Sequence, residues 1–331
     1  MNYRVFGKTE LKVSEIGLGC SSFGGGLYNI NDQESTKTLL QAFDSGINFY
    51  DTYDSYNQGN SERLIGWAFK GRRDRVIIAS KVGTVYSPLG NFALRIRPLL
   101  RPVRRFLHPI RTSLNRMLYS ERHKDFSVKH LTKAIHESLK RLQTDYIDLY
   151  QLHNPLLSIL EKGDFCEALE GLKTQGKIRY YGVSCATVDD ALTCLKYPGI
   201  SSVQVVINLL DQEAITKLLP LAQDKKLAVI ARVPLAQGLL TNAKSDTKAE
   251  QLAKNKRELE DRKNRAKKFQ FLVKENRTMA QAALQFVLQL QGVSVAIPGM
   301  TKIKHLQETL GTLTAPPLTQ EEFENIYSIG S

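Results

Sequence analysis

Short apolar segments alternate with amphipathic segments along most of this chain. Each apolar segment has the length and composition of a buried strand, and each amphipathic segment repeats its apolar positions with the period of a helix. The predicted strands lie at about 14–19, 47–51, 75–81, 146–153, 178–184, 202–207, 227–233 and 294–298. The predicted helices lie at about 33–46, 61–70, 128–143, 161–176, 187–196, 212–226 and 303–312. Eight strands, most followed by one helix, predict an α/β fold that closes as a (β/α)8 barrel.

Three regions depart from this alternation. The first residues, YRVFGKTELKVSEIGLG, read as a β-hairpin around residues 7–9 that precedes the first barrel strand. Residues 84–126 form an insertion after the third strand, far longer than the usual strand–helix loop. Residues 241–275, after the seventh strand, are rich in Lys, Glu and Asn and predict a long polar helix. Because no Pro/Gly/Ser-rich linker divides the chain, we expect one barrel domain over residues 1–331.

Composition narrows the class of protein. The hydrophobic fraction of 42% is enough for a sizeable core, and no apolar run is long enough for a membrane span. The first residues are charged and alternating, without the apolar centre of a signal peptide. The four cysteines, at positions 20, 166, 185 and 194, form no CxxC pair, which favours a reducing cytoplasm. We expect no metal, since no cluster of metal ligands stands out in the sequence.

Four polar residues stand at or just beyond the ends of three predicted strands. They are Asp51 and Tyr56 in NFYDTYDSY, Lys81 in RVIIASK and His153 in YIDLYQLH. The carboxyl ends of barrel strands are where barrel enzymes place their chemistry. A phenol, a lysine, a carboxylate to hold the lysine and an orienting histidine can together form a proton relay. The alternative is a buried polar network that only holds the barrel mouth together.

Strand alternation predicts that these residues converge. Asp51, Lys81 and His153 each continue the inward-facing apolar row of their own strand. The same alternation places Asp148 on the helix-facing side, where the sequence gives no physical reason for an acid.

The chain resembles the aldo-keto reductase superfamily over nearly its whole length. The resemblance rests on segments that follow one another in the family order: GKTELKVSEIGLG, INFYDTYDSYNQGNSERLIG, VIIASKVG, LTKAIHESLKRLQTDYIDLYQLHNP, KIRYYGVS, VPLAQGLL and AIPGMTKIKHLQETL. It implies a (β/α)8 barrel that binds a nicotinamide dinucleotide in extended form without a Rossmann domain. Consistently, no GxGxxG follows any predicted strand.

The resemblance also implies roles for the four polar residues. Tyr56 would be the general acid that protonates a carbonyl, and Lys81 would be the cation that lowers the pKa of its phenol. Asp51 would hold Lys81, and His153 would donate a hydrogen bond to the substrate oxygen. The expected activity is that of an NADP-dependent carbonyl reductase or alcohol dehydrogenase acting on an aldehyde, ketone or sugar-like substrate. Some barrels of this family are instead regulatory subunits that bind the cofactor.

The cofactor site can be carried over in part. Ser184 and Gln204 match the residues that bind the carboxamide, but Cys185 stands where an asparagine is usual. Arg232 stands where many members stack a ring on the nicotinamide. Lysine at 302 suits a 2′-phosphate, which favours NADP(H) over NAD(H). The remaining residues expected at the cofactor are Pro234, Leu235, Gly238, Gly299, Thr301, Lys302, His305, Glu308 and Thr309.

The insertion carries much of the positive charge. Residues 84–126 hold eight arginines and one lysine against two acidic residues, which is more than half of the chain's net charge of +13. The segment could be a lid that grips an acidic substrate, a surface for anionic membranes, or a solvated loop. Nucleic acid is not expected, because no aromatic platform accompanies the charge. The expected partner is a small carbonyl or alcohol substrate, and the sequence leaves the oligomeric state open.

Overall fold

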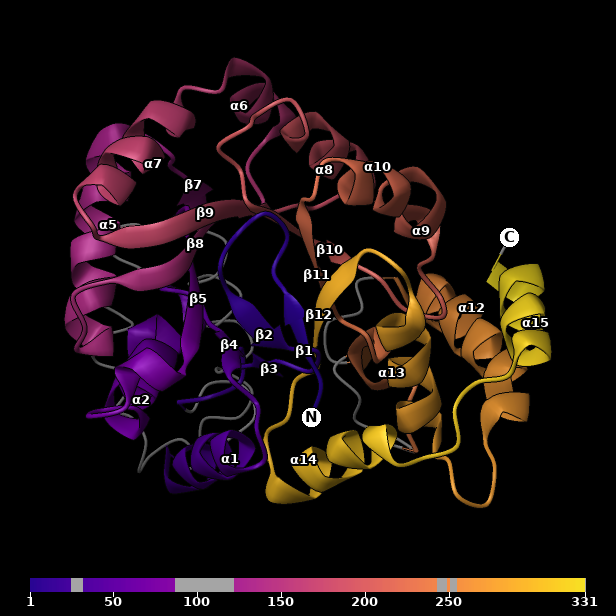
Figure 1. The fold of residues 1–331 in the computed structure, drawn as a ribbon. Coiled ribbons are helices and arrows are strands. Elements are labelled where there is room, and N and C mark those ends of the chain that lie inside the picture. Colours follow the sequence, from indigo (N-terminus) through magenta and orange to yellow (C-terminus); the bar gives the residue numbers. More distant parts are fainter. Residues whose placement is uncertain (25–31, 87–121, 243–248, 251–254, 331) are drawn as a thin grey trace.

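Eight parallel strands close into a barrel, as the sequence predicted (Figure 1). The computed structural model describes residues 1–24, 32–86, 122–242, 249–250 and 255–330. Parallel bridges from Ile16 to Ala296 and from Gly19 to Gly299 join the first strand to the last. The barrel strands are β3 (Leu18–Gly19), β4 (Phe49–Asp51), β5 (Ile77–Val82), β8 (Ile147–His153), β9 (Ile178–Ser184), β10 (Ser202–Val206), β11 (Ala228–Arg232) and β12 (Val293–Ile297).

Helices cover the outside of the barrel (Figure 1). Several begin at a residue whose side chain caps the first turn: the Ser127 hydroxyl accepts from the His130 amide, and Thr187 and Thr278 form capping boxes. The α-helices are α1 (Asp32–Asp44), α2 (Asn60–Ala68), α5 (Val128–Leu142), α6 (Leu157–Lys162), α7 (Phe165–Thr174), α8 (Val188–Cys194), α9 (Glu213–Lys217), α10 (Leu219–Asp224), α12 (Lys256–Lys267), α13 (Met279–Gln289), α14 (Ile303–Leu310) and α15 (Gln320–Gly330). Short 3-10 turns are η1 (Tyr56–Gly59), η2 (Arg73–Arg75), η4 (Ala236–Gly238), η5 (Lys268–Leu272) and η6 (Gly311–Leu313).

Two predicted helices are each divided in the structure. The helix expected over 212–226 is α9 followed by α10, because Pro220 lies in the first turn of α10 and has no amide hydrogen to continue the preceding helix. The helix expected over 161–176 is the end of α6 followed by α7. Gly163 ends α6 with a φ of 75°, a left-handed conformation that glycine adopts without strain.

The N-terminal hairpin closes the amino end of the barrel. It consists of β1 (Tyr3–Val5) and β2 (Lys12–Ser14), which pair antiparallel. Phe6, Leu11 and Val13 are buried against the lower inward-facing residues of the barrel strands, so this end of the barrel is filled with apolar side chains. The Arg4 guanidinium fastens the hairpin from outside by donating to the Val293 and Leu288 carbonyls.

Asp148, for which the sequence offered no explanation, pairs with residues of neighbouring strands and loops. Its carboxylate is almost fully buried and lies 2.6 Å from Arg73 Nη2 and 3.0 Å from Arg179 Nη1. It also accepts a hydrogen bond from the Ile78 amide at 3.0 Å. Two guanidinium groups and one amide offset the cost of burying the charge. Asp148 therefore connects β8 to β5, β9 and the loop before β5.

The two departures after the third and seventh barrel strands are confirmed in the part that the structure describes. The insertion begins and ends as a two-stranded antiparallel ribbon of β6 (Thr84–Tyr86) and β7 (Arg122–Lys124), which follows directly on β5. The expectations for a lid or a membrane surface concern residues 87–121, which lie outside the described residues. After β11, the predicted polar helix is α12, whose amino end is capped by the Asn255 side chain.

Candidate active site at the carboxyl end of the barrel

Asp51 and Lys81 form a buried ion pair at the barrel mouth. Asp51 is the last residue of β4 and pairs with Ala79 of β5, and Lys81 lies two residues further along β5. Lys81 Nζ lies 2.6 Å from Asp51 Oδ2 and also donates to the Thr52 carbonyl at 2.8 Å. Burial lowers the pKa of Lys81, while the Asp51 carboxylate acts to raise it. Asp51 therefore fixes the position of the lysine and favours its charged form.

The ion pair is connected to two residues predicted for the cofactor. Gln204 Nε2 donates to Asp51 Oδ1 at 2.8 Å, and Ser184 Oγ donates to Gln204 Oε1 at 3.3 Å. All of these side chains are buried. From the sequence, the proton relay and the carboxamide site were predicted as separate groups of residues. The structure joins them in one hydrogen-bonded chain that runs from β9 through β10 and β4 to β5.

Tyr56 is held over this chain by the turn that follows β4. Its amide donates to the Tyr53 carbonyl at 2.9 Å, and its ring lies edge-to-face against Tyr53 with a centroid distance of 5.3 Å. The next residue, Asn57, has a φ of 47°, and its side-chain amide donates to the Phe23 carbonyl. These contacts place the Tyr56 ring centroid 5.3 Å from Lys81 Nζ.

The pKa of Tyr56 is raised rather than lowered in this structure. Burial raises the pKa of Tyr56 above the ordinary value of a phenol, and the Asp51 carboxylate adds to the rise. The cation that acts in the opposite direction is Arg232. The Lys81 ammonium is paired with the Asp51 carboxylate at 2.6 Å. The phenol is therefore protonated across the physiological pH range.

His153, the last residue of β8, completes the predicted set. Its ring lies against Tyr53, with a centroid distance of 4.4 Å. Burial lowers the pKa of His153 to about 2, and the nearby cations of Lys124, Lys81 and Arg232 act in the same direction. His153 is therefore neutral at physiological pH, with one ring nitrogen as a donor and the other as an acceptor. The Tyr53 ring contacts both Tyr56 and His153.

Arg232 and Cys185, two residues predicted for the cofactor, meet at the barrel mouth. Arg232 Nη2 donates to the Cys185 carbonyl at 3.0 Å, and burial lowers the pKa of the guanidinium. The Cys185 thiol packs in the apolar layer between the strands and the helices, where it donates weakly to the Val183 carbonyl. In this structure the Cys185 thiol lies in the apolar layer, while its backbone carbonyl holds Arg232.

The turn after β11 is strained where cofactor contacts are predicted. Pro234 is buried and Leu235 is half-buried, and they are flanked by Val233 with a φ of 56° and Ala236 with a φ of 45°. Positive φ at a β-branched residue is uncommon, and such conformations gather at ligand sites. Gly238 follows with a φ of 97°, which suits glycine.

The residues predicted for the adenosine end lie after β12, at the start of α14 and along it. Gly299 has open space where a Cβ would stand, and Lys302 is the exposed residue that precedes the first turn of α14. His305 Nδ1 lies 3.3 Å from Thr301 Oγ1, which ties together two of the predicted residues. Glu308 accepts from Thr278 at 3.2 Å, and Thr309 is buried.

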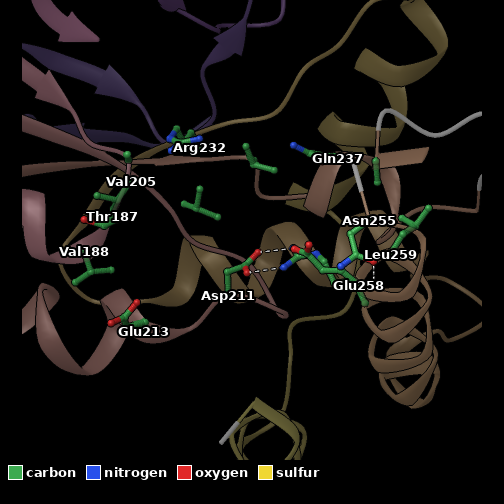
Figure 2. A pocket seen from close by; sticks show the side chains of 15 residues that line it. Thr187, Val188, Val205, Asp211, Glu213, Arg232, Gln237, Asn255, Glu258 and Leu259 are labelled. Carbon is green, nitrogen blue, oxygen red and sulfur yellow. Dashed lines mark hydrogen bonds and ion pairs between the residues drawn. The ribbon is translucent and has the colours of Figure 1, made fainter. Parts of the chain in front are cut away.

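A cavity of about 560 Å³ opens beside Arg232 (Figure 2). Figure 2 shows Thr187 and Val188 on one side of the cavity, Asn255 with Glu258 and Leu259 of α12 on the other, and Arg232 at the upper edge between them. The Arg262 guanidinium of α12 donates two hydrogen bonds, of 2.9 and 2.7 Å, to the Asp211 carboxylate across the cavity. Among the described residues, Arg232 is the one predicted site residue in the cavity lining. The cavity therefore adjoins the predicted nicotinamide end rather than containing the proton relay.

The polar groups of the mouth fit a nicotinamide dinucleotide. The amide group of buried Gln151, the Asn154 Oδ1 atom and the Arg232 Nε atom find no hydrogen-bond partner among the described residues. Buried polar atoms without partners are costly, and a ligand with donors and acceptors offsets that cost. Gln151 lies beside Lys81 in the β5–β8 ladder. Its inward-facing position in the sequence was the signal that could have identified it.

Comparison with known proteins identifies the class of protein that this barrel and its mouth define. A sequence model of the aldo/keto reductase family matches residues 15–331, so the chain belongs to the aldo/keto reductase family and is an oxidoreductase of that family. It is 31% identical to the uncharacterized oxidoreductase YqkF of Bacillus subtilis, over 99% of this chain and 96% of that protein. It is 32% identical to the NADH-specific methylglyoxal reductase of Escherichia coli, over 71% and 68%.

Solved structures agree with this assignment. The holo form of an aldo-keto reductase from Bacillus halodurans is 29% identical, with a TM-score of 0.79 over 100% of this chain and 97% of that one. An aldo/keto reductase from Klebsiella pneumoniae, solved in complex with NADP and acetate, is 27% identical, with a TM-score of 0.67 over 98% and 93%. No helix within the described residues is both long and apolar enough to span a bilayer.

Proposed function

We propose that this protein is an NADP(H)-dependent carbonyl reductase, working reversibly as an alcohol dehydrogenase, with Tyr56, Lys81, Asp51 and His153 as its catalytic set. The observation that carries the proposal is the buried Asp51–Lys81 pair of 2.6 Å, with the Tyr56 ring centroid 5.3 Å from the ammonium. A regulatory subunit that only binds cofactor has no need to bury this set, because buried charges are costly to maintain.

Each residue of the proposed catalytic set has one role in carbonyl reduction. A bound nicotinamide cofactor supplies hydride from its C4 atom to the carbonyl carbon. His153 donates a hydrogen bond to the carbonyl oxygen and orients it, and Tyr56 donates its proton to that oxygen as negative charge develops. Lys81 then lies close enough to stabilise the phenolate that remains, with Asp51 holding it in place.

Burial keeps the Tyr56 phenol protonated, which is the form that carbonyl reduction requires. Arg232 acts in the same sense, since a cation beside the nicotinamide disfavours the positively charged oxidised ring. We therefore propose that the protein mainly consumes aldehydes, ketones or sugar-like carbonyls.

The cofactor assignment rests on the start of α14. The exposed Lys302 ammonium, backed by Thr301 and His305, suits the 2′-phosphate of NADP(H), and Gly299 leaves the backbone approachable. Ser184, Gln204 and Arg232 would hold the nicotinamide end. The E. coli relative is NADH-specific by name, so cofactor choice must be tested directly.

The substrate is expected to be a small carbonyl compound, and a reducing cytoplasm is the proposed location. All four cysteines are free thiols, which supports such a compartment.

A panel of aldehydes, ketones and sugars, assayed by oxidation of NADPH and of NADH, tests the proposal. Turnover of at least one carbonyl with a preference for NADPH is expected. Tight NADPH binding with no turnover of any reactive aldehyde would instead identify a cofactor-binding subunit.

A further inference from the structure

A lysine outside the predicted catalytic set lies against the catalytic histidine. Lys124 is the last residue of β7, and the register of the ribbon pairs it with Thr84, the first residue of β6. Directly paired residues of an antiparallel ribbon project to the same face. Only Gly83 separates β6 from β5, the strand that carries Lys81. The ribbon therefore begins at the barrel mouth.

The junction between β5 and the ribbon depends on a glycine. Gly83 has a φ of 127°, and a Cβ at this position would stand 2.2 Å from the Phe126 ring. Phe126, two residues beyond Lys124, therefore packs directly on the Gly83 backbone. The Asp125 amide donates to the Gly83 carbonyl at 3.2 Å and continues the pairing. These contacts fix the position of Lys124 relative to the carboxyl end of β8.

The Lys124 ammonium donates to three acceptors around the end of β8. Lys124 Nζ lies 3.2 Å from His153 Nδ1, 2.7 Å from the His153 carbonyl oxygen and 3.3 Å from Thr84 Oγ1. Thr84 Oγ1 in turn accepts from the Tyr53 hydroxyl at 2.5 Å. An ammonium group has donors and no acceptor. His153 Nδ1 must therefore be the acceptor, which leaves the ring hydrogen on Nε2.

We propose that Lys124 is a positioning residue that fixes His153 as the neutral Nε2–H tautomer and aims that hydrogen at the carbonyl oxygen of the substrate. The second ring nitrogen of a histidine decides which nitrogen carries the proton. Here that partner is a cation on the ribbon rather than a carboxylate or a backbone carbonyl. This inference rests on the proposed reductase function for its catalytic meaning, but not for the tautomer itself.

The surroundings of His153 agree with this assignment. The cations that act on the imidazole are Lys124, Lys81 and Arg232, and all three disfavour a second proton. Tyr53 stacks on the ring, and Tyr56 lies beyond Tyr53. Asp51 is engaged with Lys81 and Gln204. Asp54, whose pKa burial raises to about 7, lies near Lys124 and accepts from Ser55 Oγ at 3.0 Å. Lys124 is the one cation of the three that touches the ring nitrogen directly.

Nuclear magnetic resonance of the 15N-histidine-labelled apo protein tests the tautomer without any assay of activity. His153 is assigned by the signal that disappears in His153→Gln. We expect the wild-type protein to show an Nε2–H tautomer that does not titrate between pH 8 and 5, the range in which an ordinary histidine of pKa ~6.5 does. An Nδ1–H tautomer, or titration with an ordinary pKa, would overturn the proposal.

Substitutions at Lys124 separate positioning from simple charge. Lys124→Met removes the donor but keeps the length of the side chain, and should raise the pKa of His153 by about 1 to 3 pH units and allow the Nδ1–H tautomer. Lys124→Arg keeps a group that can only donate, so it should retain the Nε2–H tautomer. Lys129→Met, an exposed lysine of α5, removes the same charge and should change neither property.

Kinetics then connect the tautomer to the reaction. Lys124→Met should lower kcat/KM for carbonyl reduction by about 10- to 100-fold, less than the loss of a proton donor itself, with NADPH affinity unchanged. Lys124→Arg should restore most of the activity. In a His153→Gln background, Lys124→Met should have no further effect, because its action passes through the imidazole.

Additive losses in that double variant, or an unchanged imidazole in Lys124→Met, would overturn the positioning role. A shifted tautomer in a protein that reduces no carbonyl would support the Lys124 assignment and contradict the reductase function, so the two failures are distinguishable.

Discussion

The same eight strands bury apolar side chains at the amino end of the barrel and polar side chains at its carboxyl end. At the amino end, the hairpin side chains Phe6, Leu11 and Val13 fill the interior with apolar atoms. At the carboxyl end, the same strands bury Asp51, Lys81, Ser184 and Gln204 in one hydrogen-bonded chain. Buried apolar contacts stabilise a fold, whereas buried ion pairs are often neutral or costly. The comparison indicates that the amino end supplies stability and that the carboxyl end is maintained for chemistry.

The largest expected effect comes from separating the ion pair at the carboxyl end. Lys81→Met should lower kcat by about 10² to 10⁴-fold. It should also lower the free energy of unfolding by about 3–5 kcal/mol, because the Asp51 carboxylate is left buried without a cation. The double variant Asp51→Asn/Lys81→Met should recover most of the stability and none of the activity. Denaturant titration and steady-state kinetics measure both, and a double variant as unstable as the single one would contradict the comparison.

The amino end should respond in the opposite way. Phe6→Ala removes a fully buried ring that packs against Phe49 at a centroid distance of 5.8 Å. We expect a loss of about 3–5 kcal/mol in the free energy of unfolding, with kcat nearly unchanged while the protein stays folded. Val5→Ala, at an exposed position of β1, is the matched control and should cost little. A large fall in kcat for Phe6→Ala in folded protein would mean that the two ends are not independent.

The third prediction concerns the outer edge of the carboxyl end, where the predicted phosphate group binds. Lys302→Ala should weaken NADPH by about 1.5–3 kcal/mol, since a charge-assisted hydrogen bond is lost, and should leave NADH almost unchanged. Fluorescence titration with both cofactors measures this, with Lys304→Ala as a control on the same helix. Equal losses for the two cofactors, or a wild-type preference for NADH, would exclude this phosphate site.

The smallest expected effect is a pH dependence of stability. His153 has a folded pKa lowered to about 2, below its unfolded value near ~6.5. Its contribution is therefore present above pH ~6.5 and is lost as the pH falls, because the unfolded chain binds a proton that the folded chain does not. Between pH 7 and 5.5 the wild-type protein should lose about 1 kcal/mol more than His153→Gln. Equal slopes for the two proteins would show that His153 titrates normally in the folded state.

The barrel and the convergence of its polar residues could be predicted because they depend on local periodicity. Alternation along a strand decides which side chains face inward, and parallel strands bring their carboxyl ends to one edge. Asp51 and Lys81 needed no further information to be paired. Asp148 was placed on the correct face, but its two arginine partners are 75 and 31 residues away, and alternation cannot identify them.

The parts that sequence could not supply depend on geometry across the chain. The raised pKa of Tyr56 depends on its burial and on the nearby Asp51 carboxylate, and both follow from how distant segments pack. Lys124 meets His153 only because the β6–β7 ribbon has a particular register after an insertion of uncommon length.

The central claim, that Tyr56 is the proton donor of a carbonyl reductase, is tested most directly by a single-turnover measurement. Tyr56→Phe and Tyr50→Phe are each saturated with NADPH and mixed with a reactive aldehyde. Tyr50 is the matched control, because its buried hydroxyl donates to the Ile47 carbonyl at 2.8 Å, away from the mouth. The account predicts that Tyr56→Phe binds NADPH normally but oxidises it about 10² to 10⁴-fold more slowly than the wild-type protein, while Tyr50→Phe reacts at the wild-type rate. Oxidation of NADPH by Tyr56→Phe at a rate close to that of Tyr50→Phe would contradict it.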